Sequence, residues 1–345
     1  MQHTSPRKGA DISGSFLACK KNPRKGLRLI GMIAVLLSLP YHTAMAEIAF
    51  VLNSREDSVS LIDTEKYTEI RRVPIGKEPH HLMITPDNRQ LIIANAIGNN
   101  LVFVDPLTGN ILKRIPRIAD PYQIGFSPDG RWFVVNGNRL NHVDIYHYHN
   151  GELELAKRLK YRLTPSHLAF SRDSKTVFVT VQETDRLAAI DLTTLQEKWN
   201  VATGRTPAGV WITPGQGLIL VGITGEDYVQ VFDPADGTVL RKIKTGKGAH
   251  NFLPMGDARH VLLSNRVDDT ISIIDMQTLK VTGTIAVPGG PDDMELRRDG
   301  KELWVTARWR NHVAVVNMDT RKIEHIIKVG RSPHGIYFHS HAPRI

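Results

Sequence analysis

The sequence contains little cysteine, few long apolar runs and none of three common short catalytic or cofactor-attachment signatures. Its single cysteine, Cys19, lies near the N-terminus, so the rest of the chain cannot form a disulfide or a cysteine-based metal site. Beyond the N-terminal region, no apolar run approaches the ~18 residues of a membrane-spanning helix. The patterns G-x-S-x-G, H-E-x-x-H and C-x-x-C-H are absent. The sequence therefore does not indicate an obvious catalytic machine.

Residues 1–46 have the composition of a secretory signal peptide. Seven basic residues and one acidic residue precede an apolar run over 29–39, and the small-x-small triplet Ala44-Met45-Ala46 follows. We expect cleavage after Ala46 and export to the periplasm or the cell exterior. Removing this segment lowers the formal net charge from +9 to +3. Bulk charge therefore gives little support to nucleic-acid binding.

One segment type recurs seven times after residue 47: a short apolar alternation that contains or ends in an acid or its amide. The repeated position is occupied by Asp63, Asp105, Asp144, Asp191, Asp233, Asp275 and Asn317. Successive copies are 42, 39, 47, 42, 42 and 42 residues apart. A period of about 40–45 residues is typical of a propeller blade.

Each copy supplies four short strands bounded by Gly, Pro, Asn and Asp, and no helical periodicity lasts more than two turns. We therefore predict an all-β fold: a single seven-bladed β-propeller domain over residues 47–345, built of four-stranded antiparallel blades. The first repeat lacks one strand, and the segment 333–338 supplies a spare one. We expect the C-terminal strand to pair with the N-terminal strands, which closes the ring and hides the sheet edges. A solenoid with two open ends is the alternative. Because a closed ring needs no partner chain, we expect a monomer.

In several repeats the short apolar strand that precedes the repeated acid segment ends in Asn, as in the segments 50–53, 93–95 and 134–136. These repeats resemble the YVTN family of β-propeller proteins, which includes exported bacterial proteins and archaeal surface-layer proteins. The resemblance covers residues 47–341. Repeats four, five and seven depart from it, with Val181, Gly222 and Ala307 in place of Asn. The resemblance implies the fold but no single activity, since one fold hosts unrelated functions.

Candidate site residues follow from aligning the seven corners that precede the predicted inner strands. The first residues of these strands are His80, Tyr122, Ser166, Ala208, His250, Asp292 and His334. In a closed ring, His250, Asp292, His334 and His80 occupy four consecutive blades at the channel mouth. The next positions add His81, His167, Asn251 and Asp293. Loops expected on the same face supply Arg55, Arg266, Arg308, Trp309 and Arg310.

Several interpretations of this arc remain open. His80, His250, His334 and Asp292 have the ligand types that transition metals prefer. With the flanking arginines and Trp309, the arc also suits a planar anionic cofactor. A His–Asp pair is suited to acid–base work, and histidines that merely cap the corners would have no ligand at all.

These observations favour an exported, non-catalytic binding scaffold that recognises a protein or a small anionic ligand at the channel mouth. No cofactor is required by the sequence. The alternative is a periplasmic cofactor-handling protein, haem- or quinone-linked, or a lactonase-like enzyme, because the wider family resembles the haem-binding propeller of cytochrome-cd-type nitrite reductases and also includes lactonases. Single-stranded nucleic-acid binding is a minor alternative, since acidic residues such as Asp268 and Asp269 lie among the basic ones.

Overall fold

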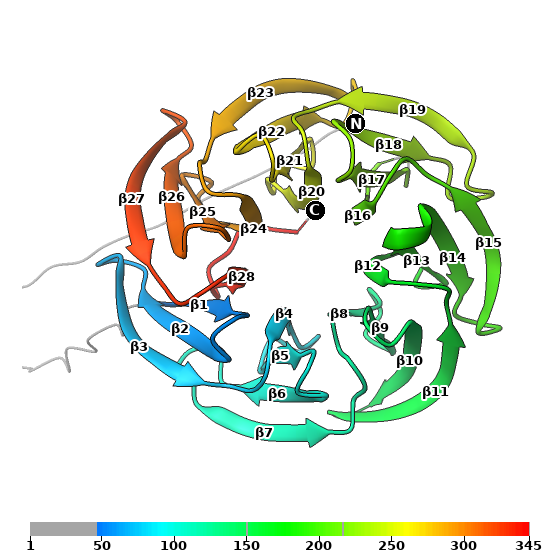
Figure 1. Cartoon of the computed structure of the whole chain (residues 1–345), viewed down its shortest axis with the longest axis horizontal. Helices are drawn as coiled ribbons and strands as arrows, with labels where there is room; N and C mark the ends of the chain where they lie inside the picture. Colours follow the sequence, from blue (N-terminus) through cyan, green and yellow to red (C-terminus); the bar gives the residue numbers. More distant parts are fainter. Residues whose placement is uncertain (1–46, 150, 216, 345) are drawn as a thin grey trace, which may run out of the picture. The chain divides into compact units, whose positions relative to one another are not determined.

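The computed structural model describes residues 47–149, 151–215 and 217–344. The predicted signal peptide lies outside these residues. Within them, seven four-stranded antiparallel sheets succeed one another around a central channel (Figure 1). The predicted seven-bladed β-propeller is thereby confirmed. The described residues contain no helix that has the length and hydrophobicity needed to cross a bilayer.

Each blade contributes one inner strand to the wall of the channel. The inner strands are β4 (Pro79–Ile84), β8 (Gln123–Phe126), β12 (Pro165–Phe170), β16 (Pro207–Ile212), β20 (Ala249–Pro254), β24 (Pro291–Leu296) and β28 (Pro333–Tyr337). The second strands are β1 (Ile48–Asn53), β5 (Leu91–Asn95), β9 (Trp132–Gly137), β13 (Thr176–Val181), β17 (Ile219–Ile223), β21 (His260–Asn265) and β25 (Glu302–Ala307). These second strands are almost entirely buried because neighbouring blades cover both of their faces.

The two outer strands of each blade complete the sheets. The third strands are β2 (Ser58–Asp63), β6 (Asn100–Val104), β10 (His142–His149), β14 (Arg186–Asp191), β18 (Tyr228–Phe232), β22 (Thr270–Asp275) and β26 (His312–Asn317). The outermost are β3 (Thr68–Pro74), β7 (Ile111–Pro116), β11 (Glu152–Lys160), β15 (Gln196–Ala202), β19 (Val239–Lys244), β23 (Lys280–Ala286) and β27 (Lys322–Lys328). One 3₁₀ turn, η1 (Gln182–Thr184), also lies among the described residues.

The ring closes through a sheet that joins the two ends of the repeat region. Its strand order is β28-β1-β2-β3, with Phe50 opposite Tyr337 and Val51 opposite Ile336. The apolar cluster beside this seam combines β1 side chains with Trp304 of β25 and with Phe338. Hydrogen-bond pairing and apolar packing thus both act at the closure, as predicted.

The acid that marks each repeat is explained by local hydrogen bonding. Asp63 Oδ1 accepts from the backbone N–H groups of Glu65 and Lys66, both at 2.9 Å, and caps the turn between β2 and β3. The same side-chain turn recurs at Asp105, Asp191, Asp275 and Asn317. Asp and Asn stabilise such turns by mimicking a backbone acceptor. The repeated acid is therefore structural.

Candidate functional site

The channel wall is made of the positions that the sequence alignment brought together. Side chains near the start of the inner strands line a cavity of about 250 Å³. They include His81, Gln123, His167, Asn251 and Asp293. The inner strands β16 and β20 lie very close to each other, because a Cβ on Gly209 would be 1.9 Å from the carbonyl oxygen of His250. The seven strands all begin on the same side of the ring, which we call the loop face.

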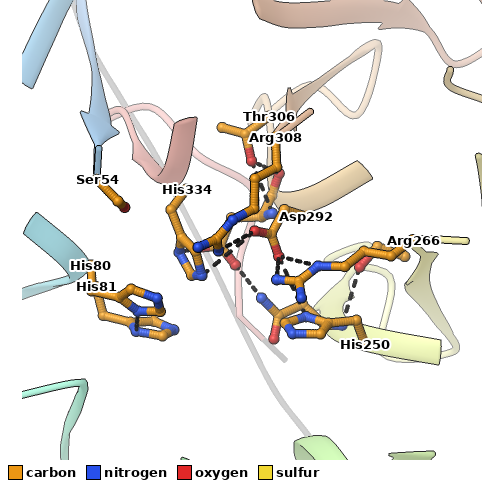
Figure 2. A network of polar contacts seen from close by, with 12 residues as sticks. Ser54, His80, His81, His250, Arg266, Asp292, Thr306, Arg308 and His334 are labelled. Carbon is orange, nitrogen blue, oxygen red and sulfur yellow. Dashed lines mark hydrogen bonds and ion pairs between the residues drawn. The ribbon is translucent and has the colours of Figure 1, made fainter. Parts of the chain in front are cut away.

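Asp292 is the charged centre of the channel mouth (Figure 2). Its Oδ1 accepts from Arg266 Nε at 3.1 Å, and its Oδ2 accepts from Arg308 Nη1 at 3.0 Å. The two arginines lie on loops that follow the second strands, which therefore emerge on the loop face as expected. Burial alone would raise the pKa of Asp292, but the charge of Arg266, with smaller effects of His334, His250 and Arg308, holds that pKa well below its usual range. Asp292 is therefore an anion.

Imidazoles flank this carboxylate on both sides. His250 Nδ1 lies 3.4 Å from Asp292 Oδ1, and His334 Nε2 lies 3.5 Å from Asp292 Oδ2. The other nitrogen of His334, Nδ1, lies 3.5 Å from Asp293 Oδ2. Asp293 is also oriented by Asn251, which donates from its side-chain amide. Figure 2 shows His334 between the Asp292 network and the pair His80–His81.

His80, His81 and His334 form a compact cluster, which we call the three-histidine cluster. The ring centroids of His80 and His334 are 3.9 Å apart, and those of His81 and His334 are 4.8 Å apart. One ligand atom from each of the three residues lies within 4.8 Å of the others. Relative exposures are 2% for His80, 7% for His81 and 0% for His334. Burial, the largest cause, lowers the pKa of His80 well below its usual value and that of His81 to about 4.

A separate pocket of about 430 Å³ opens on the loop face next to the mouth. It is lined by Arg55, Arg308, Trp309, Asn311, Arg331 and Ser332. Trp309 is 58% exposed. Arg308 belongs both to this pocket and to the Asp292 network. Arg310 is exposed as well, and its aliphatic part packs over Gly289.

The opposite end of the channel is partly covered by the residues that follow β28. Ala342 donates its N–H to the carbonyl of Leu296 at 2.7 Å and is buried in the apolar cluster of the β20 and β24 blades. Arg344 lines the channel cavity and donates to the buried carboxylate of Glu295. Burial raises the pKa of Glu295 to about 7, although the charge of Arg344 acts in the other direction.

The structure brings together six of the nine predicted site residues: His80, His250, Asp292, His334, Arg266 and Arg308. Arg55 and Trp309 lie in the neighbouring pocket, and Arg310 lines neither. The four predicted metal-ligand candidates do not form the closest ligand set among the described residues, because His81 takes the place of His250 and Asp292. The signal for His81 was present in the adjacent histidines at 80 and 81. Arg331 was not predicted because it lies in the corner before β28, whereas the predicted arginines lie in the loops after the second strands.

Comparison with known proteins supports the fold and adds distant relatives. A curated relative, the dihydro-heme d1 dehydrogenase of Pseudomonas aeruginosa, is 21% identical over 303 residues, which are 82% of this chain. The chain spans only 61% of that relative's length.

Solved structures share the fold at low sequence identity. Dihydro-heme d1 dehydrogenase NirN in complex with DHE aligns with a TM-score of 0.66 at 17% identity, covering 88% of this chain and 78% of that one. The periplasmic gluconolactonase PpgL of Pseudomonas aeruginosa aligns with a TM-score of 0.71 at 17% identity, covering 84% and 98%. A family model described as the YNCE-like beta-propeller matches residues 32–344. The chain therefore belongs to the YNCE-like β-propeller family.

Proposed function

We propose that this chain is an exported, non-catalytic binding protein that holds a small, flat, polycarboxylated ligand on the loop face of its propeller. The observation that carries the proposal is the pocket formed by Arg55, Arg308, Arg331 and Trp309. Guanidinium groups pair with carboxylates through two parallel hydrogen bonds, and they also stack on planar groups. Arg55 and Arg331 beside one exposed indole suit a ligand with acid groups on a flat apolar body, whereas Arg308 is paired with Asp292.

The rim of the channel on the loop face carries further exposed apolar side chains. Ile97, Leu140, Leu163 and Val267 are each 41–57% exposed, and they lie in loops or corners of the loop face. A single exposed leucine needs no explanation. Four exposed aliphatic side chains and Trp309 give this face apolar surface in addition to its arginines.

A carboxylated tetrapyrrole is the first candidate ligand, because a distant relative is a dihydro-heme d1 dehydrogenase. Arg55 and Arg331 fit its acid groups, and Trp309 fits its ring face. The imidazoles below do not fit as axial ligands in this arrangement, since His80 and His334 are 2% and 0% exposed and Arg308 extends between them and the pocket. Binding would therefore rest on carboxylates and stacking.

The alternatives find less support in the same geometry. A lactone substrate would need access to an acid–base pair, but His334 is fully buried, and Asp292 is held as an anion by two arginines. A nucleic-acid strand would meet Asp268 and Asp269 on the same loops as Arg266. A protein partner would use the same rim, and it is distinguished by the experiment below.

Absorbance titration of the purified protein with a haem-type dicarboxylate tetrapyrrole tests the proposal. We expect saturable binding at one site, with affinity at least about tenfold weaker in Arg55→Ala/Arg331→Ala, because two charge-assisted pairs are lost. The dimethyl ester of the same tetrapyrrole should bind as weakly to the unaltered protein. Arg172→Ala, which removes an arginine from a pocket lined by the ends of the inner strands at the other side of the ring, is the matched control and should bind normally. Equal binding of acid and ester, or no binding of either, would contradict the proposal.

A further inference from the structure

We infer that the three-histidine cluster is a binding site for one divalent first-row transition-metal ion, held by His80, His81 and His334. This inference does not depend on the proposed function, because the cluster lies below the loop-face pocket and shares none of its lining residues. Imidazole is a ligand that Zn²⁺, Cu²⁺ and Ni²⁺ accept readily.

The position of the His81 proton supports this inference. His81 Nδ1 lies 2.7 Å from the carbonyl oxygen of Tyr122. A carbonyl oxygen only accepts hydrogen bonds, so Nδ1 carries the proton. With this proton on Nδ1, the buried and unpartnered Nε2 of the neutral ring presents its lone pair to the cluster. Metal-bound histidines are commonly oriented by such a second bond to a backbone carbonyl.

Unpartnered nitrogens provide a second, independent observation. His81 Nε2 is buried and has no hydrogen-bond partner, and the same holds for both nitrogens of His334. Leaving a buried polar atom unpaired is unfavourable, because the atom loses its bonds to water and gains none in return. A neutral imidazole has one lone pair, so His81 Nε2 and one of the two His334 nitrogens can each bind a cation, while the other His334 nitrogen carries the proton and faces a carboxylate.

The dimensions of the cluster are compatible with one ion. A zinc–nitrogen distance of about 2.0–2.1 Å puts the ligand atoms of a tetrahedral site about 3.4 Å apart. The three ligand atoms lie within 4.8 Å of one another, so modest side-chain rotations would close the site. His81 also lines the channel cavity of about 250 Å³, which leaves room for a water molecule as fourth ligand.

The surrounding charges are close to balanced. The carboxylates of Asp292 and Asp293 lie 3.5 Å from the two nitrogens of His334, and they favour a cation. Arg266 and Arg308 oppose it, but both are paired with Asp292. Asp293 is paired with no arginine in the described structure, and its negative charge therefore remains available to a bound ion.

Calorimetric titration of the untagged full-length protein with Zn²⁺, Cu²⁺ and Ni²⁺ tests the inference, after chelator treatment and dialysis. We expect one equivalent to bind, and the Cu²⁺ complex should give an electron paramagnetic resonance spectrum with nitrogen coupling. Affinity should fall by at least about 100-fold in His81→Gln and in His334→Gln, because loss of a ligand exceeds the 10–100-fold effect of losing an orienting partner.

The matched control is His250→Gln, a buried imidazole of the same mouth that lies outside the cluster. It should retain one equivalent with affinity changed by less than about threefold, well below the effect of losing even an orienting partner. Circular dichroism and thermal unfolding of each metal-free variant establish whether it is folded. If one of the two ligand variants does not fold, the other one carries the test. Failure of the folded, unaltered protein to bind any of the three ions would overturn the inference. So would tight binding that survives in both ligand variants.

Discussion

Val51 of β1 lies opposite Ile336 of β28, so residues from the two ends of the repeat region are direct neighbours in one sheet. Ile336 is 4% exposed and packs in the apolar cluster beside this seam. The pairing covers the inner edge of β1 and gives this blade the same four strands as the other six. Its strength should govern the stability of the whole ring.

Shortening Ile336 to Ala should therefore lower the free energy of unfolding by about 2–5 kcal/mol, as is typical when a buried isoleucine is truncated. Denaturant unfolding monitored by tryptophan fluorescence measures the change. Ile326→Ala is the control, because Ile326 is 53% exposed on the outermost strand β27; it should change stability by no more than about 0.5 kcal/mol. Equal effects of the two substitutions would mean that the seam contributes nothing special.

Replacing Asp292 with Asn should destabilise the protein by about 3 kcal/mol. The substitution leaves the partly buried guanidinium groups of Arg266 and Arg308 without their shared anion, and breaking one partner of a buried pair has costs of this size. Thermal and denaturant unfolding measure the loss. The exposed pair Lys244–Asp227 offers the comparison: Asp227→Asn should leave stability nearly unchanged, because solvent screens an exposed pair. A similar small cost for Asp292→Asn would show that the network is not needed for stability.

Glu295 should make stability depend on pH between about 4.5 and 7. Burial raises its folded pKa from its ordinary value of 4.5 to about 7. In this interval the folded state binds a proton that the unfolded state has released, so the contribution is present at low pH and is lost as pH rises through 7. The unaltered protein should gain on the order of 3 kcal/mol relative to Glu295→Gln as pH falls from 7 to 4.5. Parallel stability curves for the two proteins would contradict the shift.

Adding a methyl group at Gly209 should destabilise the ring by about 1–3 kcal/mol or more, the usual range for overpacking. The new Cβ would lie 1.9 Å from the carbonyl oxygen of His250, so the inner strands β16 and β20 would have to move apart. Gly215→Ala is the control, because a Cβ there meets nothing within 4 Å. Unfolding midpoints of the two variants should differ clearly; matching midpoints would mean that the strands separate without cost.

The fold was predictable from the sequence because its signals are periodic. The repeated acid at intervals near 42 residues reflects a turn that most blades share, and the displaced strand at 333–338 indicated the closure. The position of His80, His250, Asp292 and His334 at one mouth followed from the same alignment. Periodicity alone was sufficient for these inferences.

The internal arrangement of the site was not predictable in the same way. That His81 replaces His250 in the compact cluster depends on how its ring is oriented by the Tyr122 carbonyl. The burial of His80 and His334 beneath Arg308 depends on the direction of a loop side chain. Side-chain direction and depth are set by packing between blades, which a repeat pattern does not contain.

The three-histidine cluster joins β4 to β28, and these strands become neighbours only when the last blade has been sealed. A nascent or unsealed chain holds His80 and His81 but keeps His334 far away. The cluster can assemble only after synthesis of β28, so any ion that it captures would report completed folding rather than guide its early steps. Loading would then take place in the compartment where the finished ring resides.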